Sequence, residues 1–242
     1  MVRFDVYSGS NSIGPGHSEN QDSYLTDLST QTFAVADGVG GYAGGKEASS
    51  LAMASLRNKA GGIQNEFSMA SSLEEIHEQL LHTAKSLNHQ NMGTTIAVAK
   101  VFPDFSTGMG GKVLTANAGD SPILLFSAAS DSDSYLRVFV DDSLRDKSPG
   151  SMFGVIQYLG MESDLELKVH TMSSEYHSGD ILLLCTDGVS DNLLGERVYS
   201  QHGSVGDVSE LVKRHGSAQM IVEEALRARI KPDDMTALLV FL

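Results

Sequence analysis

The sequence predicts a single α+β domain. Helical patterns occur in the first part of the chain and near its C-terminus, and from Gly93 onward a series of short strands is separated by Gly, Ser and Asp turns. With 242 residues, of which 41% are hydrophobic and 20% charged, the chain can bury a sizeable core. No repeat, heptad pattern or low-complexity linker is found, so we expect one domain spanning residues 1–242.

The N-terminal part predicts strands followed by a helix. Alternation of apolar and polar residues in Arg3–Ser8 is typical of a half-buried strand, and a second strand is expected to begin near Asp22. The apolar run Phe33–Ala36 indicates a buried strand. Glu47–Lys59 is rich in Ala, Leu and Met and predicts a helix that stops at Gly61-Gly62.

A second helix is predicted from a capping box. Ser72 with Glu75 has the spacing of such a box, in which a hydroxyl and a carboxylate satisfy backbone donors at a helix start. Behind it, apolar residues recur at steps of three and four, namely Leu73, Ile76, Leu80, Ala84 and Leu87. We therefore expect an amphipathic helix that begins near Ser72.

The remainder of the chain predicts strands and two further helices. The β-branched and apolar runs are Thr94–Phe102, Lys112–Ala118, Ile123–Phe126, Leu136–Val140, Leu165–Met172 and Asp180–Cys185. One helix is expected after Asp191, and another over Ser209–Ile230 with a break at Gly216. The apolar segment Met235–Leu242 predicts a buried final strand.

Charge and cysteine content exclude several classes of protein. A net charge of -14 argues against sequence-independent nucleic-acid binding, which needs clustered Lys and Arg. No apolar stretch is long enough to cross a bilayer, and no signal-like segment opens the chain. The lone cysteine, Cys185, cannot form an internal disulfide and is expected to be a small core residue. We predict a cytoplasmic protein without membrane or nucleic-acid partners.

Asp37 is the first candidate functional residue. It follows the strand predicted at Phe33–Ala36, and Gly38 begins a glycine-rich stretch whose backbone can approach a ligand closely. A carboxylate beside bare backbone suits Mg²⁺ or Mn²⁺, which prefer oxygen ligands. For this stretch alone, an Asp-Gly turn that joins a strand to a helix explains the pattern equally well.

The arrangement at Asp37 recurs at Asp22, Asp120, Asp187 and Asp233, each at the end or start of a predicted strand. Taken singly, each could be a turn or cap aspartate. Clustered carboxylates repel one another and desolvate poorly, and cations would relieve that cost. Two-metal hydrolytic sites are built in this way, with a pair of ions that clamps a phosphoryl group and lowers the pKa of a water.

The order of these motifs resembles that of a known family. The blocks are Asn20-Gln21-Asp22, Asp37-Gly38-Val39-Gly40-Gly41, Gly93-Thr94-Thr95, Asn117-Ala118-Gly119-Asp120-Ser121, Thr186-Asp187-Gly188 and Asp233-Asp234-Met235-Thr236. Across nearly the whole chain they resemble the metal-dependent protein phosphatases of type 2C, the PPM family, in their compact bacterial form. The resemblance implies a four-layer α-β-β-α sandwich of two antiparallel sheets flanked by helices.

The resemblance also implies a metal centre with two Mn²⁺ or Mg²⁺ ions. In that family's pattern Asp37 bridges the two metals and the Gly38 carbonyl binds one of them. Asp187 and Asp233 complete the shell of the second metal, and Asp22 matches the acidic position of the first motif. A third, weaker metal position corresponds to Asp120.

Several residues depart from the family's pattern. His17 stands where the family usually has a phosphate-binding arginine; it is therefore the candidate substrate-binding and catalytic residue of the first motif, with an inert loop histidine as the alternative. Gln21 replaces a common glutamate, and Val39 a histidine found in many eukaryotic relatives. Pro122 replaces an arginine and Asp234 an asparagine, so substrate preference should not be copied from relatives.

The expected function is hydrolysis of phosphoserine or phosphothreonine in proteins, by attack of a water that bridges two Mn/Mg ions. By the resemblance, the partners are phosphorylated proteins, targets of a bacterial Ser/Thr kinase or the kinase itself. Two alternatives stay open. His17 and Pro122 would suit a binding module that keeps the metals without turnover, and the same centre could hydrolyse a small phosphoester.

Overall fold

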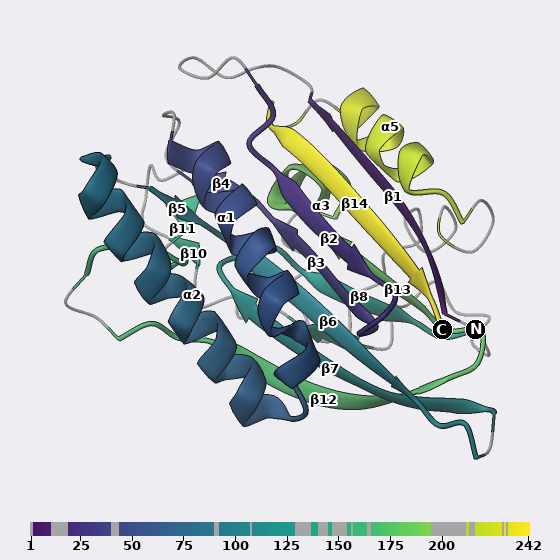
Figure 1. The fold of residues 1–242 in the computed structure, drawn as a ribbon. Coiled ribbons are helices and arrows are strands. Elements are labelled where there is room, and N and C mark those ends of the chain that lie inside the picture. Colours follow the sequence, from purple (N-terminus) through teal and green to yellow (C-terminus); the bar gives the residue numbers. More distant parts are fainter. Residues whose placement is uncertain are drawn as a thin grey trace.

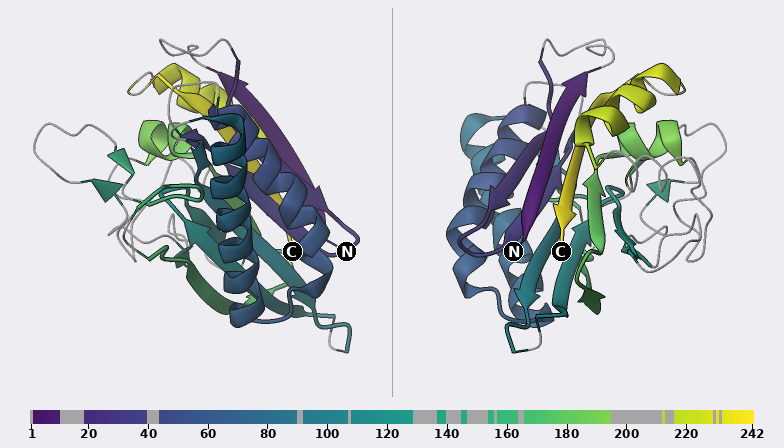
Figure 2. Two further views of the ribbon diagram at one scale, coloured as in Figure 1. Left: turned by 60° about the vertical axis from the view of Figure 1, so that its left-hand side comes forward. Right: turned by 90° about the vertical axis from the view of Figure 1, so that its right-hand side faces the viewer.

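Two five-stranded sheets pack face to face and carry helices on their outer faces, as the views in Figures 1 and 2 show. The strand pairs within both sheets are antiparallel. The predicted four-layer α-β-β-α sandwich is therefore confirmed. The computed structural model describes residues 2–10, 19–39, 44–89, 92–106, 108–128, 137–139, 145–146, 154–155, 157–163, 166–194, 212, 216–228, 230 and 232–242.

The first sheet contains both ends of the chain. Its strand order is β1-β14-β13-β8-β9, with bounds β1 (Arg3–Ser10), β8 (Ile123–Phe126), β9 (Arg137–Phe139), β13 (Ile181–Cys185) and β14 (Asp234–Phe241). Helices α3 (Asp187–Leu193) and α5 (Ala218–Ala228) pack on its outer face. Because β1 pairs with β14 from Arg3 against Phe241 onward, the two termini lie side by side (Figure 1).

The second sheet has the order β12-β7-β6-β3-β2. Its strands are β2 (Ser23–Asp27), β3 (Thr32–Ala36), β6 (Ile96–Pro103), β7 (Gly110–Ala118) and β12 (His170–His177). Helices α1 (Gly44–Lys59) and α2 (Glu66–Leu87) cover its outer face, joined by the 3-10 turn η1 (Ala60–Gly62). No helix in the described ranges is long and apolar enough to cross a membrane.

Two short strand pairs stand outside the main sheets. β4 (Gly38–Val39) pairs with β5 (Gly93–Thr94), and β10 (Arg145–Asp146) pairs with β11 (Gly154–Val155). The first pair continues directly from Asp37, so Gly38 and Val39 are held by pairing with the segment before β6.

Three layers of buried apolar side chains hold the four layers together. Strand β3 shows why: Phe33 and Val35 join the core between the sheets, whereas Ala34 and Ala36 face the helices. Successive side chains of a strand point to opposite faces, so a strand covered on both sides reads as a continuous apolar run. The small alanines let α1 pack closely on the sheet, and the larger residues fill the space between the sheets.

Helix α2 begins about two turns earlier than the sequence predicts. Its N-cap is Asn65, whose side chain accepts from Ser68 N at 2.9 Å, while Ser68 Oγ accepts from Asn65 N at 3.0 Å. The capping box predicted at Ser72 is therefore wrong, and Ser72 Oγ instead donates to Ser68 O at 2.7 Å inside the helix. The apolar stripe was correctly placed at Leu73, Ile76 and Leu80, which are fully buried. Its last two members are less buried: Ala84 is half-buried and Leu87 is exposed.

Other boundaries also differ from expectation. The strand predicted at Leu165–Met172 begins later, at His170, and the helix expected after Asp191 begins at Asp187. Of the helix predicted over Ser209–Ile230, the structure shows α5 over Ala218–Ala228; Gly216, where a break was predicted, lies just before it and has φ +54°, a left-handed conformation. Most of 209–215 lies outside the described residues.

The observed cap makes a stability prediction. Asn65→Ala should lower the free energy of unfolding by about 1 kcal/mol, because the first turn of α2 loses a side-chain acceptor. Ser72→Ala, which removes only a bond to a helix carbonyl, should cost clearly less. Urea unfolding followed by circular dichroism measures both, and equal losses would contradict the assignment of the cap.

Candidate metal centre

The antiparallel topology of the second sheet brings three of the predicted aspartates to one end. Ser23 at the start of β2 pairs with Ala36 at the end of β3, so Asp22 and Asp37 are neighbours across the two strands. The end of β7 pairs with the start of β6. Because β3 and β6 are also antiparallel neighbours, Asp120, just after β7, follows at the same end.

The first sheet adds two more carboxylates at that end. Cys185, the last residue of β13, pairs with Ala237 near the start of β14. Asp187 follows β13 and Asp233 precedes β14, so both lie where these two strands meet. The five aspartates therefore come from strand ends that the fold gathers at one edge of the sandwich.

Asp22 joins the two sheets through hydrogen bonds. Its Oδ2 accepts from Thr186 Oγ1 at 2.9 Å and from Thr236 Oγ1 at 2.7 Å, and both threonines belong to the first sheet's end. Next to it, Gln21 N donates to Asp234 Oδ2 at 2.7 Å. The Asp22 side chain is thus fixed in orientation, and its buried Oδ1 has no hydrogen-bond partner among the described residues.

The backbone of Asp37 is held by two threonines. Its carbonyl oxygen accepts from Thr95 N and from Thr94 Oγ1, both at 2.8 Å, and its N–H donates to Thr95 Oγ1 at 3.1 Å. Thr95 Oγ1 lies 2.8 Å from Ser121 Oγ, which follows the buried Asp120. These bonds fix Asp37 relative to the loop that carries Asp120.

Two glycines permit this close packing. A Cβ on Gly38 would lie 2.4 Å from Gly45 O, and a Cβ on Gly188 would lie 2.0 Å from Asp234 O. Real Cβ atoms do not approach backbone oxygen so closely, so any side chain at either position would push apart the segments that present the carboxylates.

The carboxylates perturb one another. Burial, helped by the charges of Asp234 and Asp233, raises the pKa of Asp22 to about 8. The hydrogen bonds from the two threonine hydroxyls offset this rise only in part. Burial of its carboxyl group raises the pKa of Asp37 well above the ordinary value, helped by the charges of Asp187, Asp22 and Asp233. Without cations, burial and the neighbouring charges therefore favour the protonated forms of Asp22 and Asp37.

The donor set fits hard divalent cations. It consists of carboxylates, and Asp22 Oδ1 is a buried oxygen whose hydrogen-bonding capacity is unused by the described residues. Among those residues, no three His, Cys, Asp or Glu side chains already surround one point closely enough to hold an ion. Ion binding would therefore require carboxylates such as Asp37 and Asp187 to turn toward the cation.

Other predicted residues have mixed outcomes. His17 lies outside the described residues. Cys185 is fully buried, and burial raises the pKa of its thiol, in agreement with a core residue rather than a nucleophile. Sequence reasoning gave no role to Thr95, Thr186 or Thr236, although all three lie inside the motif blocks; their position beside the acidic residues was the available signal.

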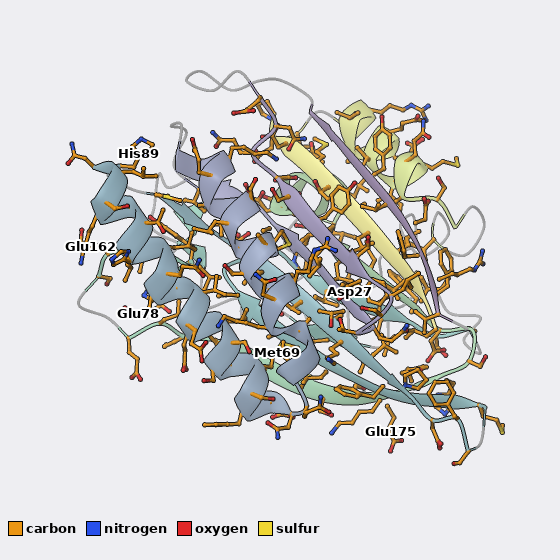
Figure 3. The ribbon with its side chains drawn as sticks, in the orientation of Figure 1. Asp27, Met69, Glu78, His89, Glu162 and Glu175 are labelled. Atoms are coloured by element: carbon orange, nitrogen blue, oxygen red, sulfur yellow. The ribbon has the colours of Figure 1, made fainter. Side chains whose placement is uncertain are left out.

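A hollow away from the carboxylates does not compete with this assignment. It has a volume of about 910 Å³ and lies between α2 and residues 161–163 and 166–167. Figure 3 shows two of its residues, Glu78 and Glu162, on the outer side of α2. None of the five clustered aspartates lines it, and its walls carry several glutamates instead. The strand-end cluster is therefore the better candidate for phosphate chemistry, because it unites buried, perturbed carboxylates.

Comparison with known sequences identifies the family. The family described as Stage II sporulation protein E (SpoIIE) matches residues 29–241, which include every clustered aspartate except Asp22. The chain belongs to the SpoIIE family. A search of curated proteins finds no match for this SpoIIE-family chain.

Solved structures similar to this SpoIIE-family chain include two that are named serine/threonine phosphatases. PppA, a key regulatory component of T6SS in Pseudomonas aeruginosa, is 21% identical with a TM-score of 0.73, covering 99% of this chain and 97% of that one. The Mycobacterium tuberculosis serine/threonine phosphatase PstP/Ppp is 21% identical with a TM-score of 0.72, covering 100% and 98%. The S. agalactiae serine/threonine phosphatase is 17% identical with a TM-score of 0.74, covering 100% of both.

These likenesses establish the fold. Together with the family match, they confirm the resemblance to the PPM phosphatases that the motif order indicated. A further structure holds the PstP catalytic domain in complex with two manganese ions.

The raised pKa values predict an unusual pH dependence of stability. Asp22 has a folded-state pKa of about 8 against 3.8 when unfolded, so the metal-free folded state binds the proton more tightly. Stability should therefore fall as the pH rises from about 4 toward about 8. Thermal unfolding in chelator at pH 5.5, 7 and 8.5 measures this effect.

Two controls accompany the pH measurement. Asp22→Asn should flatten the pH dependence, because the amide does not titrate. Asp27→Asn removes a turn carboxylate at the other end of β2, whose pKa is lowered by its hydrogen bonds to Ser29 and Thr30, and should leave the slope at pH 5.5–8.5 unchanged. A wild-type protein whose metal-free stability rises over this interval would contradict the assignment.

Proposed function

We propose that this SpoIIE-family chain is a metal-dependent serine/threonine phosphoprotein phosphatase. The observation that carries the proposal is the convergence of Asp22, Asp37, Asp187 and Asp233 at one end of the sandwich, where burial and the neighbouring charges disfavour the ionised forms of Asp22 and Asp37. Such a cluster is costly in the absence of cations, and a pair of divalent ions would stabilise it.

The residues divide into ion-holding and positioning groups. Asp37 and the Gly38 carbonyl, with Asp187 and Asp233, would hold two Mn²⁺ or Mg²⁺ ions. A third, weaker position would use Asp120. When bound, such ions lower the pKa of a water nucleophile and neutralise the phosphoryl group. The PstP domain with two manganese ions supports this stoichiometry by analogy of fold.

The chain's own residues would orient this centre. Thr186 and Thr236 hold Asp22 Oδ2, which leaves Oδ1 to face a cation or a water that a cation binds. Thr94 and Thr95 bind the backbone N–H and carbonyl oxygen of Asp37, so the position from which its carboxylate projects is fixed. Positioning partners of this kind commonly change metal affinity or activity by about 10–100-fold when removed.

The substrate class is inferred by analogy with the similar structures. The similar structures are named as serine/threonine phosphatases, and a strand-end cluster at the edge of a sandwich suits a phosphorylated side chain presented by another protein. We infer that the substrates are phosphoserine or phosphothreonine residues of proteins, targets of a Ser/Thr kinase or the kinase itself. His17, in place of an arginine, would contact the phosphoryl group.

The test is metal-dependent hydrolysis. Purified protein with Mn²⁺ should release phosphate from p-nitrophenyl phosphate and from a phosphothreonine peptide, and excess chelator should stop both reactions. Asp37→Asn should lower kcat/KM by more than about a hundredfold, because a ligand shared by both ions contributes more than an outer partner. Phosphate release measured with malachite green reports each rate.

Asp27→Asn is the matched control, since it also removes one carboxylate from the second sheet but at the far end of β2 (Figure 3 labels Asp27). This variant should keep near wild-type activity. Activity that survives chelation, or that is equal in the two variants, would refute the proposal. Binding of Mn²⁺ by calorimetry without any turnover would indicate instead a module that keeps the metals for binding only.

A further inference from the structure

A second hollow lies next to the carboxylate cluster, between α1 and the edge strand β2. Its volume is about 450 Å³, and it begins at Asn20 and Asp22. The remaining lining residues are Ser23, Tyr24, Lys46, Ser50 and Met53. We call it the Lys46 hollow. One of the clustered aspartates, Asp22, lies in its wall, so a substrate whose phosphate reached the cluster could extend along it.

Lys46 is the cation of this hollow. Its Nζ donates to Asp22 O at 2.6 Å and lies 3.4 Å from Ser23 Oγ. An ammonium group has three N–H donors, and within the described part of the chain the third has no protein acceptor. The side chain is half-buried, and its bond to the Asp22 carbonyl holds the positive charge at the border of an otherwise acidic site.

The rest of the hollow suits a polypeptide side chain. Lys46, Ser50 and Met53 stand at steps of four and three on α1, so they share one face of the helix. On the opposite wall Ser23 Oγ lies 3.3 Å from Ser50 Oγ. An anionic group would meet Lys46 and the two hydroxyls, while the aliphatic part of its side chain could contact Met53.

We propose that the Lys46 hollow is a specificity subsite for a carboxylate side chain that flanks the phosphorylated residue of the substrate; this inference rests on the proposed phosphatase function. Lys46 is the charged group in it that attracts anions, in a protein whose net charge of -14 would otherwise repel an acidic substrate. An extended peptide advances about 3.3 Å per residue, so a glutamate one to three positions from the phosphorylated residue could reach it.

The test compares matched phosphothreonine peptides with Mn²⁺. The peptides carry Glu, Gln or Lys at each position from three before to three after the phosphothreonine. Wild-type protein should prefer Glu over Gln in kcat/KM by about fivefold at one or more positions, the effect expected of a partly exposed ion pair. Lys46→Gln should abolish this preference, and Lys46→Glu should reverse it in favour of Lys.

Lys59→Gln is the matched control. It removes the same charge from the same helix, where Lys59 pairs with Glu75 on α2, far along the helix from the hollow. This variant should keep the preference for Glu. A wild-type protein without preference at any position, or a preference that survives Lys46→Gln, would overturn the subsite.

Two further readouts separate the subsite from the proposed function. The rate on Gln peptides tests phosphatase activity alone. Binding of the Glu and Gln peptides to Asp37→Asn, measured by fluorescence polarisation, tests the subsite without turnover, and the Kd ratio should again be about fivefold and be lost on adding Lys46→Gln. If Lys46→Gln instead lowers rates equally on all peptides and on p-nitrophenyl phosphate, Lys46 contacts the reacting phosphate and the flanking subsite is wrong.

Discussion

The cost of bringing several carboxyl groups together out of water is the constraint on which this site depends. The charges of Asp187, Asp22 and Asp233 help to raise the pKa of Asp37, although these residues come from distant parts of the chain. A folded protein can tolerate such a cluster if protons or cations neutralise it. The raised pKa values correspond to neutralisation by protons. The proposed pair of metal ions would neutralise the carboxylates instead, and would also make the site reactive.

Hydrogen bonds between the sheets make that cluster possible. Asp22 belongs to the second sheet but is held by Thr186 and Thr236 from the first, and Gln21 N reaches Asp234 in the same way. The apolar core between the sheets, which includes Phe33 and Leu184, stabilises their packing along the length of the strands. The polar bonds at the end then set how the two halves of the site face each other.

The sequence was sufficient for much of this picture, and the failures have physical causes. Apolar runs placed the central strands, because strands covered on both faces have a simple pattern; β8 was predicted residue for residue. The start of α2 was missed because Ser72 and Glu75 have the spacing of a capping box, whereas Asn65 and Ser68 form the reciprocal bonds. The aspartates were found from their position at strand ends. The roles of Thr95, Thr186 and Lys46 could not be read in this way, since each depends on a partner at least 20 positions away in the chain.

Absent side chains are as important to this site as the acidic ones. The backbone at Gly188 passes so close to Asp234 that even a methyl group would have no room, and Gly38 is similarly enclosed by Gly45. Neither glycine contributes a side-chain ligand, yet each determines how near two acidic segments can come. In a survey of random substitutions, alanine at these two positions would rank among the most harmful changes, and a search for functional residues by chemical type alone would overlook both.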